Sequence, residues 1–277
     1  MTTEAAGGAL DRRQHCAVVT GGGSGIGAAC CLALAAEGYR VAVACRGVAH
    51  GERVVEDVKR LGGEAMFVRT DVSVERDCEN LVSAAEERLG PIGVLVAAAG
   101  ILTSPSQNLD SGSKDSGIEQ PYTDVVNLSL SAWSTVLDIN LTGSMLSARA
   151  AARRMLANAE GPKSIVMVSS GSGTRPIPGR AEYCVSKTGV NMFTKVLARE
   201  LAQHNIRVNC VAPGRVLTPM TTELFGVLSP DGVPKDVPLR RFATSEEIAN
   251  AIVFLTSEKA SYITGEILFV DGGKVAY

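Results

Sequence analysis

A phenol and an ammonium group stand four positions apart in the stretch AEYCVSKTG, as Tyr183 and Lys187. The surrounding residues are typical of a helix, and residues i and i+4 of a helix share one face. The two groups are therefore expected to point in the same direction. Such a pair is common, and it predicts chemistry only where another part of the chain requires an acid or a base.

A hydroxyl group is placed to meet this pair. Ser170 ends the predicted strand SIVMVSS (164–170), thirteen residues before Tyr183. In an open α/β sheet, ligands bind beyond the carboxyl ends of the strands. We therefore expect Ser170 and the start of the helix that carries Tyr183 to face one crevice.

A glycine-rich turn should face the same crevice. The first predicted strand (16–20) runs directly into TGGGSGIG (20–27), which is followed by a helix. Glycines between a strand and a helix let the backbone approach a pyrophosphate, and the free N–H groups of the helix start stabilise the anion. This context favours nucleotide binding over a merely tight turn.

The end of the second predicted strand, ACRG, bears on the choice of cofactor. Cys45 stands where NAD-binding units commonly carry an acid for the ribose 2′-hydroxyl, and Arg46 follows it. A neutral residue removes repulsion from a 2′-phosphate, and a guanidinium can bind that phosphate. The pattern favours NADP(H), with NAD(H) possible and an ordinary surface arginine as the alternative. Asp71 could hydrogen-bond adenine, or cap the next helix together with Ser73.

Short apolar runs alternate with helical patterns along the chain. Continuous apolar strands separated by helices are typical of a parallel sheet covered on both faces. We predict an α/β fold, a single-domain, doubly wound, seven-stranded parallel sheet with helices on both faces. The predicted strands are 16–20, 40–45, 65–70, 93–100, 164–170, 206–214 and 265–273. Helices are predicted at 25–38, 51–63, 73–90, 130–157 and 245–258 and around Tyr183, with capping signals at Ser73, Ser129 and the pair Thr244 and Glu247.

Composition narrows the class of protein. The 277 residues fit one large domain over 14–277, with residues 1–13 as a flexible tail. A formal charge of −2 and a single Trp give no reason to expect nucleic acid or an anionic membrane as partner. Seven scattered cysteines without C-x-x-C and three distant histidines argue against a metal site or a disulfide framework. Without an apolar leader or a membrane-length run, we expect a soluble, cytoplasmic protein.

Several motifs occur together in one order: TGGGSGIG, YCVSK, VNCVAPGRVLTPM and the closing segment TSEEIANAIVFLTSEKASYITGEILFVDGG. In these motifs the chain resembles the classical short-chain dehydrogenases/reductases over about residues 15–273, and most closely the members that resemble 3-oxoacyl-acyl-carrier-protein reductases. The resemblance implies hydride transfer between a nicotinamide cofactor and a carbonyl compound or secondary alcohol.

The resemblance also implies roles for four residues. Tyr183 is the expected proton donor in reduction and base in oxidation, with a pKa lowered by Lys187 and an oxidised nicotinamide. Lys187 is expected to hydrogen-bond the nicotinamide ribose, and Ser170 to hold the substrate oxygen. The spacing to Tyr183 favours Ser170 over Ser169. Asn140 is expected to order a water that links Lys187 to solvent, or else simply to break the regularity of its helix.

For the cofactor, the resemblance implies contacts along the whole groove. Val216 and Thr218 are expected at the carboxamide and pyrophosphate, and residues 218–240 as a mobile substrate lid. The expected cofactor-binding residues are Gly21, Ser24, Gly25, Ile26, Gly27, Arg46, Asp71, Val72, Ala99, Gly100, Tyr183, Lys187, Pro213, Gly214, Val216 and Thr218. A small-molecule substrate and a homotetramer, with the helices after the fourth and fifth strands as interfaces, are also implied.

The chain departs from the family pattern at three places. Ala97 and Ala98 replace two asparagines that usually support the sheet and turn. Ser24 is neutral where NADP(H)-preferring relatives often carry a basic residue. A polar insertion loop (102–127) could roof the active site, contact a neighbouring subunit, or do neither. Two other functions stay open: an NAD-dependent dehydrogenase working in the oxidative direction, and a dinucleotide-sensing protein without turnover.

Overall fold

A computed structural model describes residues 15–102, 123–158, 161–225 and 235–276 of the chain. The predicted tail, most of the predicted insertion loop and the middle of the predicted lid lie outside these ranges.

The described residues form a parallel seven-stranded sheet in the order β3-β2-β1-β4-β5-β6-β7. Strand order therefore reverses between β1 and β4, where ligands bind in open α/β sheets. The strands are β1 (Cys16–Thr20), β2 (Arg40–Cys45), β3 (Ala65–Arg69), β4 (Ile92–Ala97), β5 (Lys163–Val168), β6 (Ile206–Pro213) and β7 (Ile267–Val270). The predicted doubly wound α/β sheet is confirmed.

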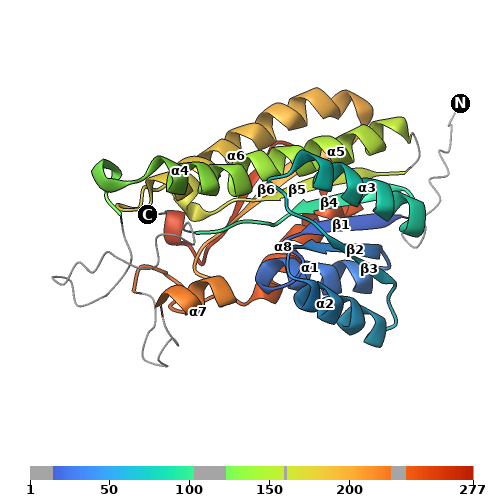
Figure 1. Cartoon of the computed structure of the whole chain (residues 1–277), viewed down its shortest axis with the longest axis horizontal. Helices are drawn as coiled ribbons and strands as arrows, with labels where there is room; N and C mark the ends of the chain where they lie inside the picture. The colour runs from blue at the N-terminus through green and yellow to red at the C-terminus, as the bar shows by residue number, and fades with distance from the viewer. Residues whose placement is uncertain (1–14, 103–122, 159–160, 226–234, 277) are drawn as a thin grey trace, which may run out of the picture.

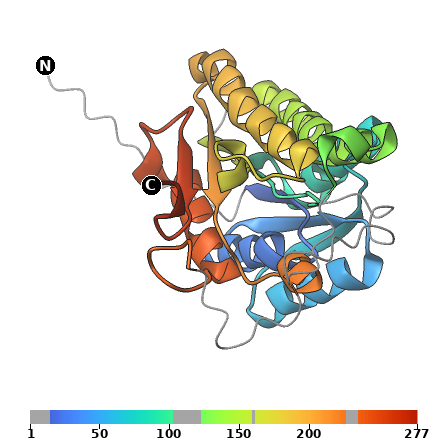
Figure 2. The same cartoon turned by 90° about the vertical axis from the view of Figure 1, so that its left-hand side faces the viewer.

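Helices cover both faces of the sheet (Figures 1 and 2). One layer consists of α3 (Glu75–Leu89), α4 (Leu130–Leu137), α5 (Gly143–Ala157) and α6 (Ala181–Leu201). The other consists of α1 (Gly25–Ala36), α2 (Val48–Arg60) and α8 (Ser245–Thr256), with α7 (Pro219–Phe225) beside it.

Alternate residues of the central strands fill two separate cores. In β1, Cys16 and Val18 pack with the core under α3, α5 and α6, whereas Ala17 and Val19 pack with the core under α1, α2 and α8. Because both faces of a parallel sheet are buried, its strands read as continuous apolar runs rather than as alternating ones. The thiols of Cys16, Cys30, Cys31, Cys78 and Cys210 are buried in these layers as small apolar groups.

Two of the three predicted helix caps are confirmed. The Ser129 hydroxyl accepts a hydrogen bond from the backbone of Ala132, and Thr244 and Glu247 form a reciprocal capping box. The prediction for Ser73 is wrong: α3 begins at Glu75, and the Ser73 hydroxyl donates instead to the Asp71 carboxylate, at 2.6 Å.

The predicted continuous helix 130–157 is also wrong in one respect. It is divided into α4 and α5 by a π-helical turn at Asp138–Thr142, with Asn140 in its middle. Such wide turns occur inside helices, often at functional sites.

In the described part of the chain no helix has the length and apolarity that a membrane crossing needs.

Candidate active site and dinucleotide groove

The glycine turn between β1 and α1 brings two backbone segments into close contact. Gly21 has φ +68°, and a β-carbon on Gly27 would lie 2.2 Å from the Gly21 carbonyl oxygen. No side chain at Gly27 fits this space, so the turn packs the start of α1 directly on the end of β1.

The start of α1 is open to an anion. Its N-cap residue Ser24 makes no side-chain hydrogen bond to the helix, and the first turn carries no acid. The first N–H groups of a helix have no partners inside it, and the positive end of the helix dipole points the same way. This backbone cradle can therefore hold a phosphate group.

Two hollows lie at the carboxyl ends of the strands and share Gly100 and Ile101. The inner hollow, of about 590 Å³, lies among β4, β5, α6 and the segment after β6. The outer hollow, of about 480 Å³, lies at the ends of β2 and β3. Because they share two residues, the hollows form one groove that passes the glycine turn.

The inner hollow contains the phenol and the ammonium group of the sequence analysis. Tyr183 and Lys187 both line it from α6, and the Lys187 Nζ lies 5.7 Å from the centre of the Tyr183 ring. The Lys187 Nζ also donates to the Val168 carbonyl oxygen at 2.9 Å, which ties α6 to the end of β5. Burial lowers the pKa of Lys187 to about 8.

The pKa of Tyr183 shifts in the opposite direction from that of Lys187. Burial raises the pKa of its phenol, and a hydrogen bond with Ser170 and the charge of Arg180 oppose that shift without outweighing it. The sequence analysis expected Lys187, together with an oxidised nicotinamide, to lower this pKa. In the protein alone the phenol is instead held in its neutral, proton-donating form.

The two neighbouring serines have different partners. The Ser169 hydroxyl donates to the backbone oxygen of Lys187 at 3.0 Å, and so it helps to fix α6 against β5. The Ser170 hydroxyl accepts from the backbone of Ser172 at 3.2 Å and donates to the Ser172 hydroxyl at 3.3 Å. Both serines line the inner hollow together with Tyr183, and the choice of Ser170 over Ser169 stays a prediction.

Asn140 is fully buried and bonds to the chain that leaves β4. Its Oδ1 accepts from the Ile101 N–H at 2.8 Å, and its Nδ2 donates to the Ile101 oxygen at 2.8 Å and to Ser186 Oγ at 3.1 Å. A β-carbon on Gly100 would lie 3.2 Å from Asn140 Oδ1 and 3.4 Å from Lys187 Nζ. Gly100 thus stands between the amide and the ammonium group. The expected water beside Asn140 stays a prediction.

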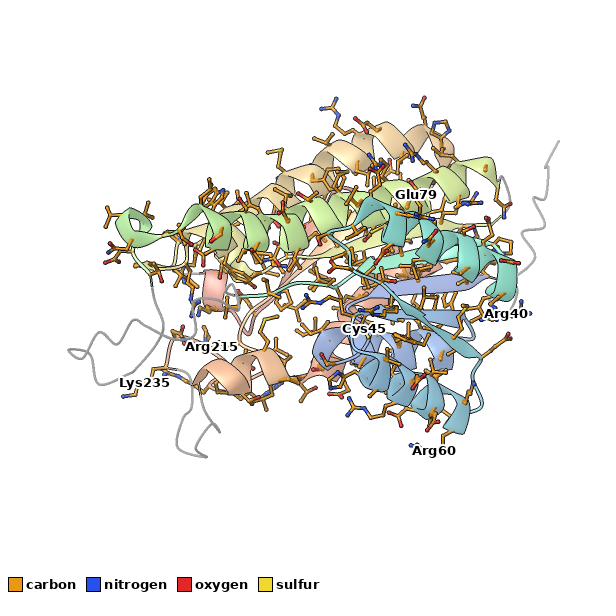
Figure 3. All side chains as sticks on the ribbon, viewed as in Figure 1. Arg40, Cys45, Arg60, Glu79, Arg215 and Lys235 are labelled. Carbon is orange, nitrogen blue, oxygen red and sulfur yellow. The ribbon has the colours of Figure 1, made fainter. Side chains whose placement is uncertain are left out.

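The outer hollow is lined by Cys45, Arg46, Thr70 and Asp71. Figure 3 labels Cys45 beside the start of α1, and its thiol donates to the Gly47 oxygen at 3.3 Å. Burial raises the pKa of this thiol, so it stays neutral.

Asp71 is the acid of the outer hollow. Burial would raise the pKa of its carboxyl, but hydrogen bonds from Ser73 and the charges of Arg46 and Arg69 lower it overall. Of the two roles left open, capping of α3 is wrong, because the carboxylate binds the Ser73 N–H and hydroxyl at 3.0 and 2.6 Å. A bond to adenine stays a prediction.

The segment after β6 closes the inner hollow. Val216 and Thr218 line it, and Thr221 Oγ1 donates to the Val216 oxygen at 2.7 Å. A β-carbon on Gly25 would lie 3.3 Å from Thr218 Cγ2, so this segment rests against the glycine turn.

Ion pairs connect the C-terminal part of the predicted lid, at Asp236, to Arg215 and Lys274. Arg215 Nε and Nη2 donate to the two Asp236 oxygens at 2.9 and 3.0 Å, and Lys274 Nζ lies 2.6 Å from Asp236 Oδ2. Burial would raise the pKa of Asp236, but these hydrogen bonds lower it to about 2.

Comparison with known proteins agrees with this geometry. Residues 21–274 match the family model described as enoyl-(acyl carrier protein) reductase. A 3-oxoacyl-(acyl-carrier-protein) reductase of Synechocystis sp. is 36% identical over 94% of this chain and 97% of its own length. The chain belongs to the short-chain dehydrogenase/reductase family. It is therefore an oxidoreductase that acts on CH–OH or keto groups with NAD(P).

Other members of the family are similar over nearly the whole chain. Glucose 1-dehydrogenase 2 of Bacillus subtilis is 34% identical over 94% of this chain and 95% of its own length. The crystal structure of a short-chain type dehydrogenase/reductase from Mycobacterium marinum matches with a TM-score of 0.84 and 31% identity, covering 95% of this chain and 96% of that one.

Most of the predicted cofactor residues line the groove of this short-chain dehydrogenase/reductase. Ser24, Gly25 and Gly27 do not line either hollow and instead build the turn behind them. The predicted residues that line the groove are Gly21, Ile26, Arg46, Asp71, Val72, Ala99, Gly100, Tyr183, Lys187, Pro213, Gly214, Val216 and Thr218.

Sequence reasoning missed other residues of the groove: Thr70, Ile101, Ile139 and Val168. These are apolar or small polar residues in no recognisable motif, and only the fold brings them to the groove. Met220 and Thr221, which also line it, fall within the predicted lid 218–240. The alanines at Ala97 and Ala98 have a partial substitute, because the Thr20 hydroxyl accepts from the Ala99 N–H at 3.3 Å.

Proposed function

We propose that this short-chain dehydrogenase/reductase is an NADP(H)-dependent carbonyl reductase in which Tyr183 is the acid and base. One observation carries the proposal. Ser170, Tyr183 and Lys187 line a single hollow, and that hollow continues past an uncapped helix start and a glycine turn. An acid, a hydrogen-bond donor, a cation and a dinucleotide cradle therefore share one groove.

The residues present fit a dinucleotide. A β-carbon on Gly27 would collide with the Gly21 carbonyl, so the turn requires glycine there, and the first N–H groups of α1 have no side-chain cap and are left for a pyrophosphate. Arg46 would hold the 2′-phosphate, Lys187 the nicotinamide ribose, and the Val216 backbone and Thr218 the carboxamide and pyrophosphate. When bound, NADPH supplies the hydride that the protein cannot supply itself.

Reduction adds a hydride to the carbonyl carbon and a proton to the carbonyl oxygen. Tyr183 donates that proton from its phenol, which burial keeps neutral in the protein alone. The Ser170 hydroxyl, which lines the same hollow as the phenol, donates a hydrogen bond to the carbonyl oxygen and holds it in place. In oxidation the same groups act in reverse, with Tyr183 accepting the proton.

Lys187 stabilises the phenolate that remains after proton transfer. Its Nζ lies 5.7 Å from the ring centre, in a site where burial strengthens the interaction of charges. Asn140 acts as a positioning residue, since its amide fixes Ile101 at the wall of the hollow and lies beside the space between Gly100 and Lys187.

The substrate class follows from the relatives and the site together. Similarity to a 3-oxoacyl reductase supports a ketone substrate, and similarity to glucose 1-dehydrogenase 2 supports an NAD(P)-dependent alcohol dehydrogenase as the second candidate. A dinucleotide sensor without turnover is the third. The presence of Asn140, Ser170, Tyr183 and Lys187 together argues against a sensor, which needs none of their chemistry.

The test is a panel of carbonyl compounds followed by NADPH absorbance. The panel contains three compounds for reduction, a 3-oxoacyl thioester, a 2-enoyl thioester and a simple cyclic ketone. It also contains glucose, which is tested for oxidation. Reductions are assayed with NADPH and with NADH, and the oxidation with NADP⁺ and with NAD⁺. Reduction of a keto compound with NADPH preferred over NADH by about tenfold or more is expected. Preference for NADH would contradict the role of Arg46, and cofactor binding without turnover of any compound would indicate a sensor.

A homotetramer formed through α4, α5 and α6 and closure of the segment 218–240 over the substrate are proposed on the family resemblance alone. A cytoplasmic location is proposed on the sequence pattern described above.

A further inference from the structure

Arg46 is the only cation among the described residues that line the outer hollow, where the 2′-phosphate of NADP(H) is proposed to bind. Arg46 is present, but Ser24 in the glycine turn is neutral where NADP(H)-preferring relatives often carry a base. The fold brings a third segment to this position: the first turn of α2, which follows β2 after Gly47.

His50, in that first turn, lies against both the glycine turn and the end of β2. A β-carbon on Gly23 would lie 3.1 Å from His50 Cβ and 2.7 Å from the Cys45 sulfur. A β-carbon on Gly47 would lie 2.8 Å from His50 Nδ1. Two glycines therefore make room for the imidazole, which is exposed and lies close to Cys45, a lining residue of the outer hollow, without lining that hollow itself.

The surroundings of His50 favour an anion. The N-cap residue Gly47 has no side chain to cap α2, and the first turn of α2 contains no acid. The free N–H groups and the positive end of α2 therefore lie next to Arg46 and His50, which flank the N-cap residue Gly47. The nearest acid that lines the outer hollow, Asp71, is already bonded to Ser73 and close to Arg46 and Arg69.

We propose that His50 is a specificity-determining residue that donates a hydrogen bond to the 2′-phosphate of NADP(H), in place of the base absent at Ser24. Arg46 supplies one donor, from the end of β2, and His50 supplies the other, from α2. The proposal rests on the proposed NADP(H) preference and extends it to a residue that no motif identifies.

The experiment measures binding of two adenosine ligands by calorimetry, independent of turnover. Adenosine 2′,5′-bisphosphate carries the 2′-phosphate and AMP lacks it. His50→Ala should weaken binding of the bisphosphate about tenfold, as expected of one charge-assisted hydrogen bond, and change AMP binding less than about twofold. Unchanged AMP binding also shows that the variant is folded.

His204→Ala is the matched control, because His204 is likewise exposed but lies after the far end of α6. It should leave the affinity for both ligands unchanged. Equal affinity of wild type and His50→Ala for the bisphosphate, or an equal loss for both ligands, overturns the proposal. Equal affinity of the wild type for AMP and the bisphosphate overturns it together with the NADP(H) preference, whereas the carbonyl chemistry is judged separately by the substrate panel.

Discussion

The inner and outer ends of the groove are built in different ways. At the inner end, Asn140, Ser169 and Lys187 are buried, and each hydrogen-bonds to the backbone of another element. At the outer end, Arg46, which follows β2, and His50, in the first turn of α2, are exposed. In Figure 3, Cys45 marks the outer end, and Arg215 precedes the segment that closes the inner end.

Because of this difference, we expect substitutions at the inner end to affect catalysis and substitutions at the outer end to affect cofactor selectivity. The inner side chains hold the sheet, α5 and α6 together while they form the site, so a substitution there disturbs both stability and catalysis. The outer side chains carry little of the fold, so under the proposal a substitution there is expected to change the choice of cofactor with little effect on stability. Cofactor preference can therefore vary within this architecture at small cost in stability.

The largest combined loss of stability and turnover is expected at Asn140. Asn140→Ala leaves the Ile101 N–H and oxygen and the Ser186 hydroxyl without this partner, and it should cost about 2–3 kcal/mol of unfolding free energy. Because Ile101 and Gly100 form the wall beside Lys187, kcat should also fall by about 100-fold. Urea unfolding and steady-state kinetics measure the two losses.

Asn209→Ala is the matched control for this prediction. Asn209 is equally buried and also bonds to backbone, at Ile263 and Glu266, but it does not line the groove. It should lose similar stability and keep its kcat. A similar loss of kcat in both variants would mean that Asn140 acts only through stability.

The next effect is on pH dependence at the inner end. The pKa of Lys187 is lowered to about 8 and that of Tyr183 is raised, so on raising the pH the lysine loses its proton first. Since kcat/KM reports the free enzyme, kcat/KM for reduction should be level below about pH 8 and fall about tenfold per pH unit above it. If kcat/KM stayed constant up to pH 10, the charge of Lys187 would have no part in the mechanism.

The smallest effect is expected at the outer end. Arg46→Ala should weaken NADPH binding by about tenfold, leave NADH binding within about twofold, and leave the unfolding free energy within about 0.5 kcal/mol of wild type. Fluorescence titration measures the binding. Arg60→Ala, at the far end of α2 in Figure 3, is the control of equal charge. An equal loss for NADPH and NADH would contradict the selectivity assigned to this end.

The sequence predicted the features that depend on local pattern. The apolar strands, the glycine turn and the i, i+4 pair of Tyr183 and Lys187 each depend on residues close together in the chain, and the sheet and the shared hollow confirm their placement. The break in helix regularity at Asn140 was one of its two predicted roles and is confirmed, but its form as a π turn could not be predicted, because the apolar pattern of 130–157 continues through it.

Contacts between segments that are far apart in the chain could also not be predicted from the sequence. Ser73 has the spacing of an N-cap, but the neighbouring Asp71 carboxylate takes its hydroxyl, and α3 begins later. His50 approaches Gly23 only because β2 returns the chain to the glycine turn, so no local pattern marks it.

The central claim is that Tyr183 exchanges the proton beside a bound nicotinamide. The most direct measurement compares Tyr183→Phe with wild type for NADPH binding and for reduction of the carbonyl compound that the wild type reduces fastest. The account predicts a loss of turnover of about 10²–10⁴-fold with NADPH affinity changed less than about twofold. Turnover within about threefold of wild type would place the acid elsewhere and contradict the account.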